Sequence, residues 1–137
     1  MKPTELQIGN IVSFDTVPFK VVGINPPYVD LSGNGNRLRQ TDIHKEDLKP
    51  ILITKDLILK NGFIMGQDCV LGYIFYEKEI DGCYITIKTD CSNISEYNYV
   101  CHIDNADRCT IASADILYLH QLQNLLNLMD IKSDITV

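Results

Sequence analysis

The sequence lacks tryptophan, any Cys-x-x-Cys pair, and any apolar run near the roughly 20 residues that span a bilayer. Its start, MKPTELQIGN, has no apolar stretch after the lysine, which argues against a secretory signal. The five cysteines are odd in number and widely spaced, as is typical of reduced thiols rather than of a disulfide framework. These absences predict a cytoplasmic protein that does not span a membrane. No motif indicates a bound cofactor.

Positive charge is scarce in the second half of the chain. Residues 1–60 hold eight Lys or Arg against seven acids, whereas residues 61–137 hold four against eleven, within a net charge of −6. An acidic half disfavours a broad phosphate-binding surface there. Any contact with nucleic acid is therefore expected in the N-terminal half.

The N-terminal third is patterned as short strands with tight turns. LQIGNIVSF and PFKVVGI contain alternating apolar residues, and the second shifts phase at Val22. Asn25-Pro26-Pro27 ends that strand because proline cannot donate to a ladder. YVDLS and RLRQTDI then flank a turn over residues 33–36. Residues 1–53 are predicted to form a small SH3-like β-barrel, a fold-level analogy that the Ile-Gly-Asn-x-Val opening supports.

Residues 54–137 are predicted to form an α+β module that packs with the barrel as one compact unit. Thr54 is a suitable N-cap for a short helix over KDLILK, and Gly62 suits its C-terminal cap. Strand patterns follow over residues 70–113, then a helix with Ser113 or Asp115 as its cap. DITV at residues 134–137 suggests a last edge strand. The fold class is therefore α+β: barrel, short helix, antiparallel sheet and C-terminal amphipathic helix.

The C-terminal helix, YLHQLQNLLNLMD, has an uncharged polar face. Its apolar residues follow helical spacing and are expected to close the core over the sheet. The other face carries amides, which both donate and accept and cost less to bury than charges. We therefore expect this face to be partly covered, by the N-terminal module or by a second copy. The interaction candidates are His120, Gln121, Gln123, Asn124 and Asn127.

The chain contains the residue types of a zinc site and of a Cys–His catalytic pair, but their spacing fits neither. Cys91, Cys101, His102 and Cys109 invite a zinc site, yet zinc ligands usually occur in close pairs. Adjacent Cys101 and His102 would also point to opposite faces of a strand. A Cys–His nucleophile lacks any local activating pattern. The sequence therefore predicts no metal site and no catalytic residue, and a Cys-dependent enzyme stays a remote alternative.

The segment SGNGNRLR resembles a phosphate-binding loop, but a strand rather than a helix is expected after it. It lacks the Gly-Lys pattern and the helix N-terminus that bind phosphate, so a hairpin turn is the better interpretation. Arg37 and Arg39 could still contact an anion or nucleic acid from the rim of the barrel. Glu77, Glu79 and Asp81 are expected at a solvated turn.

The segments TELQIGNIV and YLHQLQNLLNLMD resemble motifs in short uncharacterised proteins of Bacteroides-type gut bacteria and their phages and prophages. That group opens with Glu-Leu-Arg-Ile-Gly-Asn-x-Val and closes with Tyr-Val-His-Gln-Leu-Gln-Asn-Leu-Tyr. Between them lies a Pro-Ile-x-Leu-Thr segment before a helix that ends in Gly-Phe, here PILIT and NGF. Gln7 replaces the usual Arg, and the ending over residues 126–129 is less aromatic. The resemblance implies a small, mobile-element-associated protein and implies no activity.

Three functions follow as hypotheses. The leading one is a non-enzymatic binding or adaptor module of phage or prophage origin, which binds an unknown protein partner or itself. The second is a nucleic-acid-binding accessory protein that uses Arg37 and Arg39. The third is the Cys-dependent enzyme.

Overall fold

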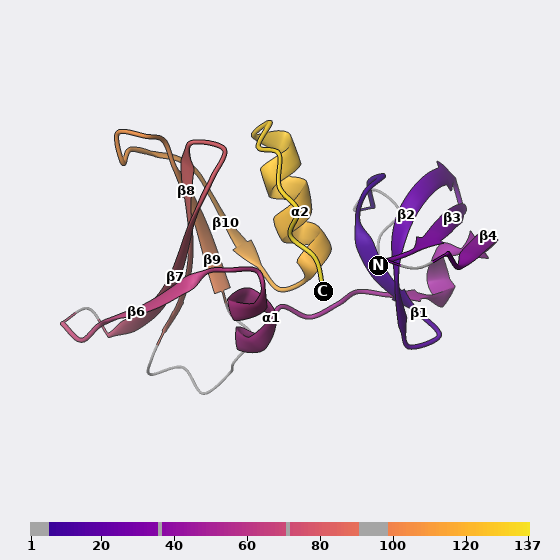
Figure 1. Ribbon diagram of the computed structural model, residues 1–137, viewed down its shortest axis with the longest axis horizontal. Coiled ribbons are helices and arrows are strands. Elements are labelled where there is room, and N and C mark those ends of the chain that lie inside the picture. Colours follow the sequence, from indigo (N-terminus) through magenta and orange to yellow (C-terminus); the bar gives the residue numbers. More distant parts are fainter. Residues whose placement is uncertain (1–5, 36, 71, 91–98) are drawn as a thin grey trace.

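The computed structural model describes residues 6–35, 37–70, 72–90 and 99–137. Over these residues the chain forms two antiparallel sheets and two α-helices, with one short 3-10 helix. The N-terminal sheet and the C-terminal sheet lie at opposite ends of the molecule, and the second helix lies between them (Figure 1). We call the two ends the N-terminal lobe and the C-terminal lobe.

The N-terminal sheet has the order β4-β3-β2-β1-β5. Its elements are β1 (Ile11–Phe14), β2 (Val17–Asn25), β3 (Tyr28–Gly33), β4 (Arg39–His44), the 3-10 helix η2 (Lys45–Asp47) and β5 (Leu48–Lys49). The predicted phase shift at Val22 is a register shift between Val21 and Gly23 in the pairing of β2 with β3. The predicted end of β2 before Pro26 and Pro27 is also confirmed.

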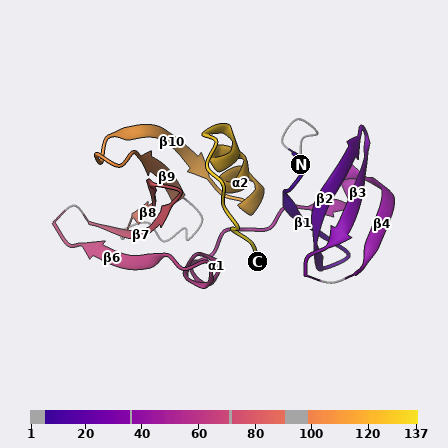
Figure 2. The same cartoon turned by 45° about the horizontal axis from the view of Figure 1, so that its top comes forward.

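The C-terminal sheet has the order β10-β9-β8-β7-β6 and curls around its core (Figure 2). Its strands are β6 (Ile64–Asp68), β7 (Tyr73–Ile80), β8 (Cys83–Asp90), β9 (Tyr99–Asp104) and β10 (Thr110–Ile116). The sequence patterns located β7 to β10 but missed β6, which forms one edge of the sheet. The prediction of an antiparallel sheet in this region is confirmed.

Helix α1 (Lys55–Lys60) has the predicted caps: the Thr54 hydroxyl accepts from Leu57 N–H at 3.2 Å, and Gly62 follows with φ +85°. Helix α2 (Leu119–Leu128) begins later than predicted. Ser113 and Asp115 lie in β10, so their predicted capping role is wrong, and Tyr118 is the N-cap.

Strand β1 contributes to both hydrophobic cores because neighbouring residues point to opposite faces of a strand. Val12 is fully buried in the N-terminal core with Val21 and Leu31. Ile11 belongs instead to the C-terminal core, with Leu122 of α2 and the fully buried Ile87 of β8. One strand therefore joins the two lobes.

The edge strand predicted over residues 134–137 is wrong, because residues 131–137 contain no strand. The Thr136 backbone bonds to the side chain of Asn61 instead of to a neighbouring strand. Neither of the described helices is long and apolar enough to cross a membrane.

Candidate functional site

A polar seam joins the N-terminal lobe to α2. We define it as Asn10 and the Ile11 N–H on one side, with Gln123 and Asn124 on the other. The Asn10 amide donates to Asn124 Oδ1 at 2.7 Å, and Ile11 N–H donates to Gln123 Oε1 at 3.0 Å. Gln123 also donates to the carbonyl of Ile135 at 3.0 Å. Asn10 is fully buried and Gln123 is 8% exposed, so the two bonds of Gln123 are buried, whereas the Asn10–Asn124 bond is half-buried.

The sequence around Gly9 explains how Asn10 reaches the seam. Gly9 has φ +98°, a conformation that residues other than glycine rarely adopt, and this turn directs Asn10 inward. Asn10 Oδ1 accepts from Gln7 N–H at 2.7 Å, while its backbone carbonyl accepts from Val21 N–H at 2.8 Å. The Gly-Asn opening and the Gln-Asn pair of α2, both from the resembling motifs, therefore meet in one structural contact.

The amide face of α2 was expected to be partly covered, by the N-terminal module or by a second copy, and Gln123 and Asn124 do hydrogen-bond to the N-terminal lobe. Gln121 caps the helix: its Oε1 accepts from Leu117 N–H at 2.8 Å and Tyr118 N–H at 3.0 Å. His120 is fully buried and stacks on the Tyr118 ring at 5.8 Å between centroids. Asn127 is exposed.

An open groove of about 330 Å³ lies where α2 meets β10 and the N-terminal segment. Residues 121, 124, 125 and 128 of α2 form one helical stripe along it, because they are separated by three or four positions. Residues of strand β10 and Gln7 of the N-terminal segment also line it. The lining residues are Gln7, Ala114, Asp115, Ile116, His120, Gln121, Asn124, Leu125 and Leu128. We call this site the α2 groove. Three of the five interaction candidates line it.

The α2 groove combines apolar and amide groups with one carboxylate. Leu128 is 80% exposed, so its apolar side chain is accessible to a ligand at the side of the groove. Asp115 is the single charged residue among the described lining residues. The groove therefore offers apolar contact and hydrogen bonds, and it favours a cation over an anion.

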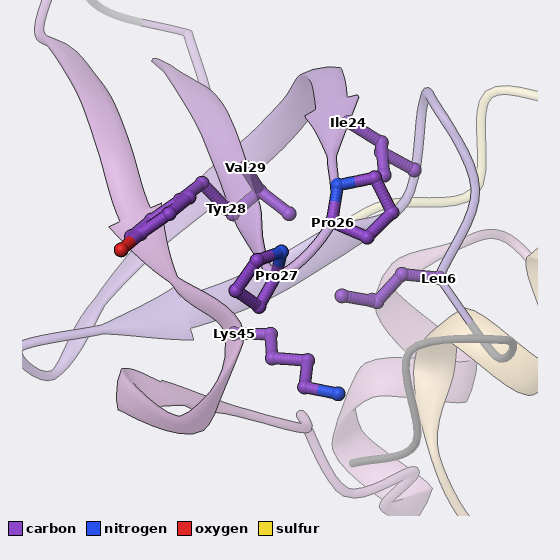
Figure 3. A pocket seen from close by; sticks show the side chains of 7 residues that line it. All are labelled: Leu6, Ile24, Pro26, Pro27, Tyr28, Val29 and Lys45. Atoms are coloured by element: carbon purple, nitrogen blue, oxygen red, sulfur yellow. The ribbon is translucent and has the colours of Figure 1, made fainter.

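A second hollow, on the N-terminal lobe, is too small for a ligand. Leu6, Ile24, Pro26, Pro27, Tyr28, Val29 and Lys45 line it, and Leu6 is directed toward Pro27 (Figure 3). Its free volume of about 10 Å³ is at most that of one water molecule. This slot is the place where Leu6 packs.

Arg37 and Arg39 are both exposed, as expected for a rim. The expected strand does follow the turn, as β4. Arg39 lies directly opposite Ser32 of β3, and Ser32 lies opposite Lys20 of β2. Directly opposed residues share a face of a sheet, so Lys20 and Arg39 lie on one face.

The cysteines do not form a site in the described part of the chain. Cys101 is fully buried in the core of the C-terminal lobe, and burial raises the pKa of its thiol to about 12. The thiol form of Cys101 is therefore favoured over the nucleophilic thiolate at neutral pH. His102 lies on the opposite face of β9, as expected, and Cys109 is exposed. Cys91 lies outside the described residues, and no metal-binding group of His, Cys, Asp or Glu occurs within them.

A charged cluster on the outer face of the C-terminal sheet escaped the sequence analysis. Glu77 lies in β7, not at a turn as predicted, and its Oε1 accepts from the Arg108 guanidinium at 2.9 Å. The same guanidinium lies 3.4 Å above the centre of the Tyr84 ring. The hydrogen bond that Arg108 donates to Glu77 raises the pKa of Arg108. These residues come from three separate segments, and no spacing in the sequence relates them.

Comparisons with known proteins found no matching family model, no matching curated protein and no matching solved structure. The function is therefore inferred from the geometry of the chain alone.

Proposed function

We propose that this chain is a non-enzymatic binding module that holds an extended peptide segment of a protein partner in the α2 groove. The observation that carries the proposal is the groove itself, with its exposed Leu128 beside amide side chains. We further propose a cytoplasmic protein of phage or prophage origin. The free cysteines support the location, and the motif resemblance supports the origin.

The chemistry of the groove favours a peptide over a small anion. Leu125 and Leu128 provide apolar contact on the α2 side, and the half-buried Ala114 lies on the β10 side. Side-chain amides such as Gln7 suit the alternating N–H and C=O groups of an extended backbone. Asp115 disfavours phosphate or carboxylate and favours a lysine or arginine in the bound segment.

The seam supports this function because it fixes the walls of the groove. Gln7 belongs to the N-terminal lobe, whereas the α2 stripe belongs to the C-terminal lobe. Two hydrogen bonds across the seam, at 2.7 Å and 3.0 Å, hold these parts in one arrangement. A groove that is formed before binding costs less ordering entropy when a ligand enters.

The N-terminal lobe is proposed to be an SH3-like barrel. Its five strands follow the order β4-β3-β2-β1-β5, and the 3-10 helix η2 lies between β4 and β5. This arrangement supports the fold assignment, which gives a platform for binding and no activity of its own.

A selection of random displayed peptides against the full-length protein tests the function. Enriched peptides are expected to combine apolar residues with Lys or Arg. Leu128→Glu should weaken their binding by about tenfold or more. Asp115→Lys should shift the selected peptides toward Asp and Glu, which is a change that a purely structural Asp115 would not produce.

Val70→Glu is the matched control, because Val70 is 94% exposed and lies outside the groove. It should leave peptide binding unchanged. A selection that enriches no peptide, or peptides whose binding is insensitive to both groove variants, would contradict the proposal.

A second candidate function is nucleic-acid binding through the N-terminal sheet. This function is supported by a row of residues across the sheet that includes two cations, namely Lys20, Ser32 and Arg39. Arg37 lies nearby in the sequence. Fluorescent single-stranded DNA and RNA are the probes. Binding should weaken with salt, and each cation replaced by alanine should reduce the salt slope by about 1. Lys55→Ala, an exposed change on α1, is the control, and salt-insensitive or absent binding rejects this function.

A further inference from the structure

Residues 131–137, which we call the strap, lie along the molecule without joining either sheet. The chain reverses after α2 and runs back beside that helix to end between the lobes (Figure 1, Figure 2). Ile131 and Ile135 are each only 4% exposed and belong to the C-terminal core. The strap is therefore an extended segment anchored by two apolar side chains.

Three amide side chains hold the strap, and we call them the cradle: Asn34, Asn61 and Gln123. Asn61 binds the Thr136 backbone twice, donating to its carbonyl at 2.6 Å and accepting from its N–H at 2.9 Å. Gln123 donates to the Ile135 carbonyl at 3.0 Å. Asn34 donates to the Thr136 hydroxyl at 3.0 Å.

This arrangement has the chemistry of a peptide-binding site that the chain's own segment fills. Side chains bind the strap backbone where a neighbouring strand would in a sheet, while two isoleucines fill apolar pockets. Most of these contacts require only that a segment has the extended backbone of the strap and isoleucines at its positions 131 and 135. None of them depends on whether the strap comes from the same chain.

A single turn connects the strap to α2. Ile131 N–H donates to the Leu126 carbonyl at 2.9 Å, and Asp130 N–H donates to the Asn127 carbonyl at 3.0 Å. This is the Schellman pattern, in which glycine usually occupies the left-handed position. Here that position is Asp130, with φ +56°. An extended Asp130 would instead direct the strap away from its own cradle.

We propose that the strap of a second copy of this chain occupies the cradle, so that two copies exchange residues 131–137 reciprocally. A second copy is the favoured occupant because its strap reproduces every contact of the closed form, and only the turn at Asp130 changes. The closed monomer predominates in dilute solution, because a tethered strap has an effective concentration of roughly millimolar. A protein concentration near or above that value favours exchange.

Complementation between two full-length variants tests the exchange. Ile135→Asp disables the strap and keeps the cradle, whereas Asn61→Ala disables the cradle and keeps the strap. Each variant alone should sediment as a monomer. Their equimolar mixture should form a heterodimer at least tenfold more tightly than either variant self-associates. A mixture that stays monomeric, with both variants folded by circular dichroism, overturns the proposal.

Two further measurements keep the test independent of any one variant's folding. In the otherwise unchanged chain, Asp130→Val should increase the dimerisation constant about tenfold, because a β-branched residue disfavours positive φ. Asp130→Gly should decrease it. A labelled peptide of residues 129–137 should bind the Ile135→Asp variant and not Asn61→Ala. Equal dimerisation of the two Asp130 variants, or a peptide that ignores the open cradle, contradicts the exchange.

Discussion

The two lobes contact different sides of the same helix, mainly by different chemistry; the exception is Ile11 of β1, which packs with the α2 leucines in the C-terminal core. Toward the C-terminal lobe, α2 presents Leu119, Leu122 and Leu126, each at most 1% exposed. Toward the N-terminal lobe it presents Gln123 and Asn124, which hydrogen-bond to β1 and the residue before it. The first contact is stabilised by apolar burial, which tolerates small shifts, and the second by hydrogen bonds that fix position. The difference teaches that the apolar stripe stabilises the fold while the amide face sets the relative position of the lobes.

A substitution in the apolar stripe of α2 should have the largest effect on stability. Leu122→Ala leaves a cavity in the C-terminal core and should lower the free energy of unfolding by about 2–5 kcal/mol. Urea titration followed by circular dichroism measures this loss. A decrease below about 1 kcal/mol would mean that the core closes around the smaller residue.

A change on the amide side of α2 should cause a smaller loss of unfolding free energy, together with faster hydrogen exchange at one amide. Gln123→Leu keeps the shape but leaves the Ile11 N–H and the Ile135 carbonyl without their partner, at a cost of about 1–3 kcal/mol. Hydrogen exchange of the Ile11 amide should accelerate beyond what the global loss explains. Asn127→Leu, an exposed amide on the same helix, should change neither value. Equal effects of the two substitutions would contradict the buried role of Gln123.

The hydrogen bond across the seam can be measured as a coupling free energy between Asn10 and Asn124. Asn10→Ala, Asn124→Ala and the double variant form a cycle whose coupling free energy should be about 1 kcal/mol, the usual contribution of one hydrogen bond. Equilibrium unfolding of the four proteins gives the value. Additive losses would show that the two amides do not depend on each other.

Much of the fold could be predicted because local patterns agree with it. The alternation that marks β8, the prolines that end β2 and the Thr54 cap all act over a few residues. Strand β6 was missed because its apolar residues are exposed: Ile64 is 77% exposed and Met65 is 49% exposed. Gly66 also weakens the pattern, and its place is covered by the Phe75 ring from the next strand. A contact of this kind, between a glycine and a ring on the neighbouring strand, cannot be predicted from the local sequence.

The site was predictable in part. An uncharged amide face indicated burial, because a solvated face usually carries charges, and Gln123 and Asn124 bear this out. Which residue faces which amide depends on tertiary structure, so Asn10 could not be identified as a partner. Residues 134–137 were misjudged as a strand because Ile135 and Val137 alternate with polar residues. Their backbone is instead bound by side chains.

Leu128 of α2, which packs in neither core, should show the smallest effect on stability. Leu128 is 80% exposed, and Leu128→Glu removes little buried surface. Its free energy of unfolding should stay within about 0.5 kcal/mol of the parent. Urea titration checks this value beside peptide binding, where the same substitution should have a large effect. Unchanged stability with lost binding would assign Leu128 to ligand binding, whereas a stability loss near that of Leu122→Ala would place it in the fold instead.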